Sequence, residues 1–309
     1  MAEPAASRTS VPSIGELLPL CAFPPAGTTV ACAVSGGADS LALLALACGA
    51  GCDVTAIHVD HGLRVGSQDE ALIVQAAAER FGARFRAERV EIVDGANLEA
   101  RCREARRSVL GPDALTGHTA DDQAETVLIN LLRGTGVTGL GAMAPGPPHP
   151  LLGLRRWQTQ GLCRLLGLVV IDDPSNQDPR FVRNRIRHEL LPLMASISDR
   201  DPVPLINRMA DHARAADAAL HTFTAGVDPT DTLALRSVAP AVRSMVLRRW
   251  LTDAGGYPPS TAEMARVLEV VEGRAVACQL RGGRRVARTR GVLRIDGWAG
   301  ETAGYDHLG

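Results

Sequence analysis

The sequence contains no lysine, so all 33 of its basic residues are arginines. This absence excludes Schiff-base chemistry on a lysine and a P-loop whose lysine reaches the β- and γ-phosphates. Any phosphate bound by this chain must be held by arginine, by backbone N–H groups or by a metal ion. Codon bias in a GC-rich genome explains the absence without reference to function, but the chemical exclusion holds in either case.

Aromatic residues and paired cysteines are also scarce. Three Trp, two Tyr and five Phe argue against aromatic base stacking as a main mode of nucleic-acid binding. The seven scattered cysteines form no Cys-x-x-Cys pair, which argues against a zinc ribbon, a thioredoxin-type site or an iron–sulfur clamp and fits a reducing compartment. The uncharged stretch between Asp39 and Asp53 has thirteen residues, too few to cross a bilayer, and the N-terminus lacks a secretory pattern. We therefore predict a cytoplasmic protein without a membrane partner.

From Thr28 the chain alternates apolar, β-rich runs with helix-patterned segments. Strands are expected at 28–34, 54–59, 84–92 and 114–117, and helices at 39–48, 68–81, 98–110 and 120–133. This order predicts an α/β fold with a doubly wound, mainly parallel sheet that binds ligands at the carboxyl ends of its strands. The Gly- and Pro-rich stretch at 134–150 is incompatible with a helix and predicts a mobile surface loop or a lid.

The 309 residues are enough for about two domains. We predict an N-terminal segment (1–27), a catalytic domain (28–196) and a smaller, helical C-terminal domain (197–309). The boundary is placed at the Ser-, Asp- and Pro-rich stretch 196–204. The C-terminal domain is expected to end in short strands, with Arg290-Gly291 at a hairpin tip.

A glycine-rich segment, Ser35-Gly36-Gly37-Ala38-Asp39-Ser40, follows the first expected strand and opens a helix. Adjacent glycines let the backbone approach an anion, and the helix N-terminus offers N–H groups to a phosphate. Asp39 is placed to face a Mg²⁺ ion. The alternative is an ordinary strand-to-helix turn with a capping residue. The motif resembles the PP-loop of the N-type ATP pyrophosphatases, whose adenine nucleotide α-hydrolase-like fold cleaves ATP between the α- and β-phosphates without a loop lysine.

Polar residues follow two other strands of the expected sheet. His58 ends the second strand, in the segment His-Val-Asp-His-Gly-Leu-Arg. His118 precedes a helix on which Asp122 and Glu125 share one face, a pair suited to Mg²⁺ or to a substrate ammonium group. A hydrogen-bonded structural histidine and helix-capping carboxylates are the simpler alternatives.

Arginines are grouped in three further places. Arg103 and Arg106 share a helix face with Glu99, which indicates either a phosphate grip or a solvated face. Arg183 and Arg187 share a face of a later helix, whereas Arg185 points elsewhere. Period-two alternation predicts that Arg284, Arg288 and Arg290 lie on one face of the last strands, available either to an RNA backbone or to solvent.

The ordered motifs resemble those of the tRNA(Ile)-lysidine synthetase family over about residues 28–195. In sequence order they are Ser-Gly-Gly-x-Asp-Ser, His-Val-Asp-His-Gly-Leu-Arg, Asn-Leu-Glu, His-x-x-Asp-Asp-Gln-x-Glu-Thr, Asp-Pro-Ser-Asn and Arg-Asn-Arg-x-Arg. The resemblance implies that ATP adenylates the C2 carbonyl of the wobble cytidine in an isoleucine tRNA with a CAU anticodon. The amine of free lysine then displaces AMP to give lysidine, which changes decoding from AUG to AUA. Thr119 stands where the family often has a second histidine, and the chain resembles a short form without the longest members' last domain.

The resemblance also implies roles for individual residues. The expected ATP-binding residues are Ser35, Gly36, Gly37, Ala38, Asp39, Ser40, His58 and Arg106, with Mg²⁺ on Asp39 and Asp122. The expected catalytic residues are Asp39, Arg103, His118, Asp122 and Glu125, of which Asp122 and Glu125 would receive lysine. The expected tRNA contacts are Asn184, Arg185, Arg187, Arg284, Arg288 and Arg290. The oligomeric state stays open, a homodimer included.

Two other functions compete with this interpretation. A 2-thiolating PP-loop enzyme in its best-known form needs paired cysteines, which the sequence lacks. A non-catalytic RNA-binding protein with a decayed nucleotide site would not need the intact phosphate loop and carboxylates.

Overall fold

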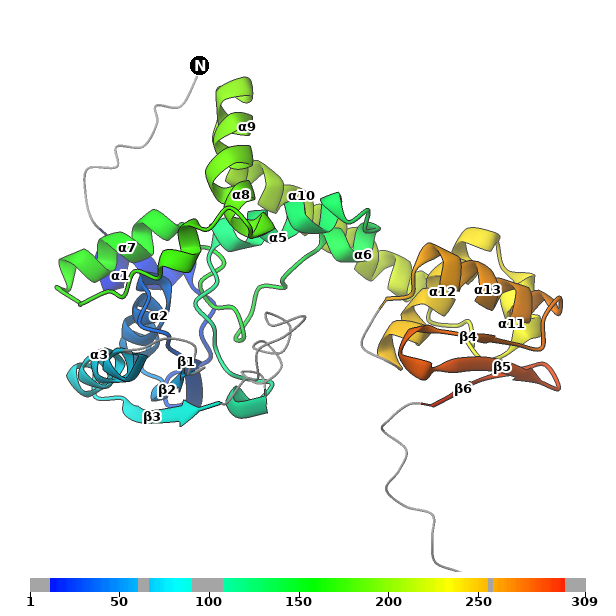
Figure 1. Cartoon of the computed structure of the whole chain (residues 1–309), viewed down its shortest axis with the longest axis horizontal. Helices are drawn as coiled ribbons and strands as arrows, with labels where there is room; N and C mark the ends of the chain where they lie inside the picture. The colour runs from blue at the N-terminus through cyan, green and yellow to red at the C-terminus, as the bar shows by residue number, and fades with distance from the viewer. Residues whose placement is uncertain (1–11, 61–66, 91–107, 255–257, 298–309) are drawn as a thin grey trace, which may run out of the picture. The chain divides into compact units, whose positions relative to one another are not determined.

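A computed structural model describes residues 12–60, 67–90, 108–254 and 258–297. The chain divides into two compact units, residues 1–215 and 216–309. The division falls within helix α10 (Pro202–Thr224). The stretch 196–204 covers the end of α9 (Leu191–Ser198), the turn at 199–201 and the start of α10. Figure 1 labels the elements.

The first unit contains a parallel sheet in the order β1 (Thr29–Ala33), β2 (Asp53–Asp60) and β3 (Arg84–Arg89). Leu115 continues the sheet beyond β1 through a single parallel bridge to Cys32. The predicted fourth strand is therefore reduced to one bridging residue. The N–H of the next residue, Thr116, faces away from β1 and bonds the Pro148 carbonyl. The chain thus crosses to the other side of β1 after β3, and such a reversal places a ligand crevice at the carboxyl end of β1.

Helix α2 (Ala38–Gly49) follows β1 and is the most buried helix of this unit. It contacts the sheet, α1 (Ile14–Leu17), α3 (Ser67–Arg80) and α7 (Arg156–Leu165). Residues 41–47 are all fully buried, as expected for a helix covered on every side. This packing brings the start of α7 to the start of α2 (Figure 1).

A second core forms around α5 (Ala120–Leu132). It packs against α8 (Val182–Arg185), a π-helical turn at Ile186–Leu190, α9 and the first half of α10. Pro192 has no N–H for the residue 188 carbonyl, which loosens the α-helical pattern at this point. Such π-turns are frequent at functional sites, and this one carries Arg187.

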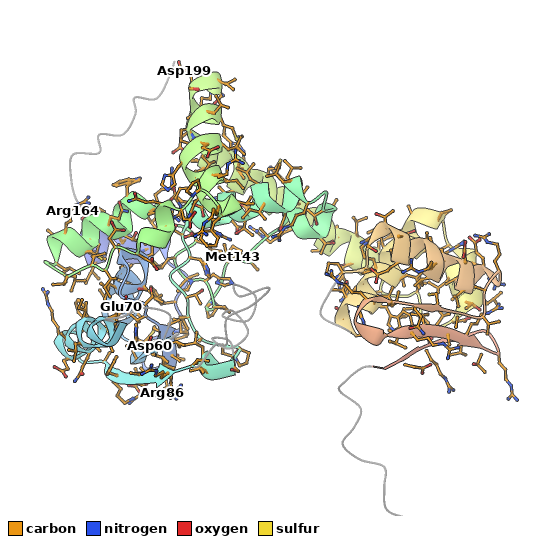
Figure 2. The ribbon with its side chains drawn as sticks, in the orientation of Figure 1. Asp60, Glu70, Arg86, Met143, Arg164 and Asp199 are labelled. Carbon is orange, nitrogen blue, oxygen red and sulfur yellow. The ribbon has the colours of Figure 1, made fainter. Side chains whose placement is uncertain are left out.

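The stretch 134–150 differs from the predicted mobile loop. It contains a short helix, α6 (Val137–Leu140), so the expectation that no helix forms there is wrong. The Gln123 amide bonds both the N–H and the carbonyl of Met143, which is labelled in Figure 2. The carbonyls of Pro148 and Pro150 accept the N–H groups of Thr116 and Ala22. The stretch is therefore attached to α5 at its middle and to the α/β core near its C-terminal end.

The described part of the second unit contains the end of α10, three further α-helices and a small antiparallel sheet. The helices are α11 (Thr232–Ser237), α12 (Pro240–Asp253) and α13 (Thr261–Glu272), and the strands are β4 (Ala277–Gln279), β5 (Arg285–Thr289) and β6 (Val292–Asp296). Leu247, Val267 and Val286 are fully buried between helices and sheet. Arg290 and Gly291 both have positive φ, which confirms the predicted hairpin tip. Among the described helices of both units, none is long and apolar enough to cross a membrane.

Candidate active site

The glycine-rich segment forms a closed loop between β1 and α2. The Ser40 hydroxyl donates to the Gly37 carbonyl at 2.9 Å and accepts the Ser35 N–H at 3.1 Å. Gly37 caps α2 and Ala38 is its first residue, so the first-turn N–H groups point out of the loop. Gly36 has φ of 86°, and its carbonyl accepts the Ile171 N–H at 3.0 Å. The predicted phosphate loop thus has a geometry suited to an anion.

Gly36→Ala is expected to weaken ATP binding strongly, because a Cβ there would lie 2.2 Å from Ile171 Cδ1 on a left-handed backbone. The strained backbone alone costs roughly 1–3 kcal/mol. Gly82→Ala is the matched control, because Gly82 has the same left-handed backbone, a Cβ there would meet no atom within 4 Å, and it lies between α3 and β3, outside the loop. Calorimetric titration with ATP measures both variants. Equal affinities for the two would contradict this account of the loop.

Gly117, two residues after the bridging residue Leu115, packs against the start of α2. A Cβ at Gly117 would lie 2.7 Å from the Asp39 carbonyl oxygen, so the two backbones touch. The flanking residues Thr116 and His118 are therefore held next to the first turn of α2.

Arg156, the first residue of α7, connects all three predicted carboxylates. Its Nη2 bonds Asp122 Oδ1 at 2.6 Å, its Nη1 bonds Glu125 Oε1 at 3.0 Å, and its Nε lies 3.4 Å from Asp39 Oδ2. Asp39 also accepts the Thr159 hydroxyl. Sequence reasoning missed Arg156. The available signal was an Arg-Arg pair, Arg155-Arg156, at the position where α7 begins.

Glu125 is completely buried and faces three guanidinium groups. Arg187 bonds it with Nε at 2.7 Å and Nη2 at 3.0 Å, and Arg183 Nη1 lies 3.3 Å from Oε2. Burial of a carboxylate is costly unless it is paired with hydrogen-bonded partners of opposite charge, and the three guanidinium groups supply that pairing. Arg183 and Arg187 therefore share the predicted face, whereas Arg185 turns away and pairs with the exposed Glu189.

The two other carboxylates have opposite pKa shifts. Burial raises the pKa of Asp39 to about 6, the charge of Asp122 adds to this rise, and Arg156 opposes it. Burial also raises the pKa of Asp122, but Arg156, the Thr119 N–H and His118 together bring it below its usual value. Asp122 Oδ2 accepts both the N–H and the hydroxyl of Thr119, each at 2.9 Å. Asp122 thus caps α5, as the alternative proposed, and also belongs to the charged cluster.

The described residues contain no group of three His, Cys, Asp or Glu side chains arranged to hold a metal ion. Asp39 and Asp122 nevertheless suit Mg²⁺, which proteins commonly bind through one or two carboxylates together with substrate phosphates. Both carboxylates already meet at Arg156.

Other predicted site residues lie in different surroundings. His58 is buried, with Nδ1 3.0 Å from the Val34 carbonyl oxygen and a buried Nε2 that has no partner. It therefore lies behind the phosphate loop. Asn184 is buried and donates to the Asp178 carbonyl at 2.9 Å, a contact within the protein. Arg103 and Arg106 lie outside the described residues.

The prediction that the arginines on one face of the last strands contact RNA needs correction. Arg284 is 7% exposed and donates from Nη1 to the Leu251 carbonyl at 3.0 Å, so it is a structural residue. Arg288 pairs across the sheet with the buried Leu293 and is half-buried on the same face. The alternation was read correctly, but this face is the one that covers the core. The outer face carries Arg285 and Arg294 instead, and Arg290 is exposed at the hairpin tip.

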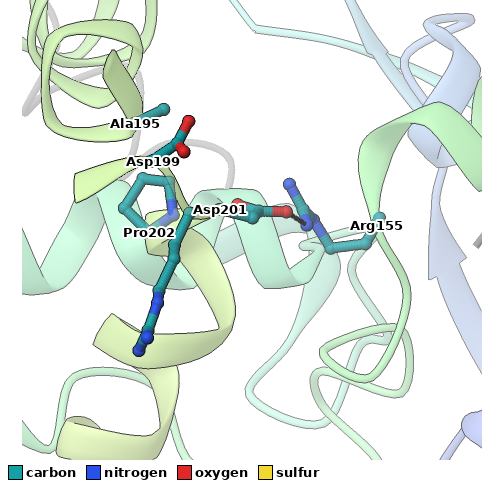
Figure 3. A pocket seen from close by; sticks show the side chains of 6 residues that line it. Arg155, Ala195, Asp199, Asp201 and Pro202 are labelled. Carbon is teal, nitrogen blue, oxygen red and sulfur yellow. Dashed lines mark hydrogen bonds and ion pairs between the residues drawn. The ribbon is translucent and has the colours of Figure 1, made fainter. Parts of the chain in front are cut away.

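A separate pocket of about 370 Å³ lies beside Arg155, at the turn between α9 and α10 (Figure 3). Its lining residues are Arg155, Ala195, Asp199, Arg200, Asp201 and Pro202. Arg155 bonds Asp121 through Nε at 3.0 Å and Nη2 at 3.1 Å, and also pairs with Asp201. The Asp201 side chain accepts the Val203 N–H at the start of α10. This pocket contains none of the three carboxylates, and its ion pairs anchor α10.

The parallel sheet, its glycine loop and the carboxylate at the start of α2 define a PP-loop protein. Residues 17–194 match the PP-loop domain family, and residues 231–294 match the TilS substrate binding domain. The chain is 39% identical to the tRNA(Ile)-lysidine synthase of Nocardia farcinica, with 88% of this chain and 93% of that protein covered. It is 38% identical to the tRNA(Ile)-lysidine synthase of Mycobacterium bovis, with 84% and 88% covered. The chain belongs to the tRNA(Ile)-lysidine synthase family.

A solved structure supports the fold. A U34-tRNA thiolase from Methanococcus maripaludis superposes with a TM-score of 0.50 at 20% identity, over 60% of this chain and 72% of that one.

Proposed function

We propose that this protein ligates free lysine to C2 of the wobble cytidine in an isoleucine tRNA with a CAU anticodon. The reaction consumes ATP, releases pyrophosphate and then AMP, and takes place in the cytoplasm, where tRNA is modified. One observation carries the proposal: a single guanidinium, that of Arg156, joins the carboxylate of the phosphate loop to the two carboxylates of α5. Nucleotide chemistry and amine recognition therefore share one site.

In the first step, the C2 carbonyl oxygen of cytidine attacks the α-phosphorus and pyrophosphate leaves. The N–H groups at the start of α2 bind the phosphates, and Arg156 lies where it can neutralise charge that develops on them. Mg²⁺ held by Asp39 and Asp122 would supply further neutralisation of phosphate charge when bound.

In the second step, the lysine amine attacks C2 and AMP leaves. Asp122 and Glu125 supply the negative charge that attracts an ammonium group, and burial of Glu125 strengthens this attraction. An ammonium group bound to Asp122 and Glu125 would occupy the carboxylate oxygens that Arg156 bonds in this structure. Arg156 must therefore shift toward the phosphates when lysine binds.

Incorporation of radiolabelled lysine into an isoleucine tRNA transcript with a CAU anticodon tests the function. A transcript with uridine at the wobble position is the matched control. Label in the first RNA alone is the expected result. Pyrophosphate release without lysine transfer, or transfer of sulfur instead, would reject the proposal.

Thiolation is the chemical alternative, since the structural relative named above is a thiolase. The six cysteines among the described residues are all free, and Cys32 and Cys163 are buried. Burial raises the pKa of the Cys163 thiol to about 12, which disfavours the thiolate needed for sulfur chemistry. Lysine transfer therefore remains the favoured reaction.

We place tRNA backbone contacts on the outer face of the last hairpin. Arg285→Ala with Arg294→Ala is expected to weaken tRNA binding and to reduce the salt slope by about one unit per lost phosphate contact. Arg249→Ala, which removes an exposed arginine from α12, is the control. Filter binding over a salt series measures both. An unchanged slope in the double variant would assign these arginines to solvent. The tRNA contact of Arg290 stays a prediction, and so does the homodimer.

A further inference from the structure

The hydroxyl of Thr116 and the imidazoles of His118 and His149 form a hydrogen-bonded group next to the start of α2. Neither of the two reaction steps accounts for this group. Thr116 Oγ1 is 2.8 Å from each of three atoms: His118 Nδ1, His149 Nδ1 and the Pro148 carbonyl oxygen. The two rings pack edge to face, with centroids 5.2 Å apart and an interplanar angle of 77°. His149 comes from the Gly- and Pro-rich stretch that the sequence predicted to be a surface loop or a lid, and it was not among the predicted site residues.

The three contacts fix the direction of each hydrogen bond. A carbonyl oxygen only accepts, so the Thr116 hydroxyl must donate its single hydrogen to Pro148. Its two lone pairs then remain, and each faces one imidazole nitrogen. Both histidines must therefore present Nδ1–H to the hydroxyl, and in a neutral ring this leaves the lone pair on Nε2.

The hydroxyl itself is held firmly. The Thr116 N–H also donates to the Pro148 carbonyl, at 3.0 Å, so Thr116 contacts this oxygen with both its backbone and its side chain. The His149 N–H bonds the Gly146 carbonyl at 2.9 Å, which sets the turn that carries the second imidazole. Burial lowers the pKa of His149, which favours the neutral ring.

We propose that Thr116 and His149 are positioning residues that hold His118 in the tautomer protonated on Nδ1, so that its Nε2 accepts the proton of the attacking lysine amine. This inference rests on the proposed function. The amine nitrogen forms its bond to C2, the C2–O bond to AMP breaks with its electron pair going to AMP, and one amine proton moves to His118 Nε2. Thr116 accepts the Nδ1–H throughout, and His149 occupies the second lone pair and supports the ring from its edge.

Nitrogen-15 NMR of the full-length protein reads the tautomer directly, because Nδ1 and Nε2 differ in chemical shift when one carries the proton. His118→Gln and His149→Gln assign the two sets of signals. In the unaltered protein both rings are expected to be protonated on Nδ1. Thr116→Val, which removes the hydroxyl, should release His118 to a mixture of tautomers, whereas Thr116→Ser should preserve the Nδ1–H form.

Single-turnover kinetics provide the second readout. Thr116→Val is expected to slow lysine transfer from the adenylated tRNA about tenfold, part of the ~10²–10⁴-fold that a general base contributes. Pyrophosphate release in the first step should change much less. His149→Phe, which keeps an aromatic ring but loses Nδ1–H, should slow transfer by a smaller factor. A purely structural role would lower thermal stability without changing the tautomer or the ratio of the two steps.

The two proposals fail in different ways. His118 protonated on Nε2 in the unaltered protein, or an unchanged tautomer in Thr116→Val, would overturn the positioning role even if lysine is transferred. Failure to transfer lysine, with the tautomers as expected, would reject the proposed reaction and with it the role of Nε2 in that reaction.

Discussion

Arg156→Ala is expected to lower pyrophosphate release by about 10²–10³-fold, the usual loss when one preorganised charge-stabilising donor is removed. The same change leaves three carboxylates without the cation that joins them, and removal of one partner from a buried ion pair costs about 3 kcal/mol of unfolding free energy. Pyrophosphate release measured well below the unfolding temperature separates the two effects. Arg156→Lys should recover little activity, because an ammonium group cannot reproduce the planar fork that reaches three separate carboxylates.

Arg155→Ala is the matched control for Arg156. Arg155 is adjacent in sequence and similarly buried, but it bonds Asp121 and Asp201 and none of the three site carboxylates. It should lower stability while pyrophosphate release at low temperature stays near the normal rate. Similar rates for the Arg155 and Arg156 variants would show that Arg156 acts through stability alone.

Glu125→Gln is expected to raise the lysine concentration needed for half-maximal transfer by about 10²-fold, because a hydrogen bond to a charged group contributes roughly 1.5–3 kcal/mol. The ATP requirement should change less, since Glu125 is the sixth residue of α5 and is paired with Arg156, Arg183 and Arg187, not with the phosphate loop. Steady-state kinetics with each substrate varied in turn measure the difference. Glu189→Gln, in an exposed ion pair with Arg185, is the control. An equal rise in both requirements would contradict a lysine site at Glu125.

The residues that sequence reasoning found share a local signature. Gly36 and Asp39 follow a strand and start a helix, and Asp122 and Glu125 are three residues apart on one helix, so short-range patterns reveal them. Arg156 has no such pattern. Its three partners lie 31, 34 and 117 residues away, and the contact exists only because α7 packs against α2.

The incorrect prediction for Arg284 has a different cause. Alternation tells which residues of a strand share a face, but the choice of the buried face depends on the neighbouring helices. The apolar Val286 and Leu293 on that face were the available signal. The lost fourth strand has a third cause, since Thr116 and Gly117 turn toward Pro148 and α2 instead of extending the sheet.

The arginines around the carboxylates make substrate binding an exchange of ions. Asp39, Asp122 and Glu125 are paired with the guanidinium groups of Arg156, Arg183 and Arg187, three with three, so the formal charges of the cluster balance. A neutral cluster has little attraction for an ammonium ion until one arginine finds another anion. The ATP polyphosphate is such an anion, so the charge balance favours an order in which ATP binds first and lysine second. An enzyme built in this way would keep its amine site closed to the proposed lysine substrate until the nucleotide has arrived.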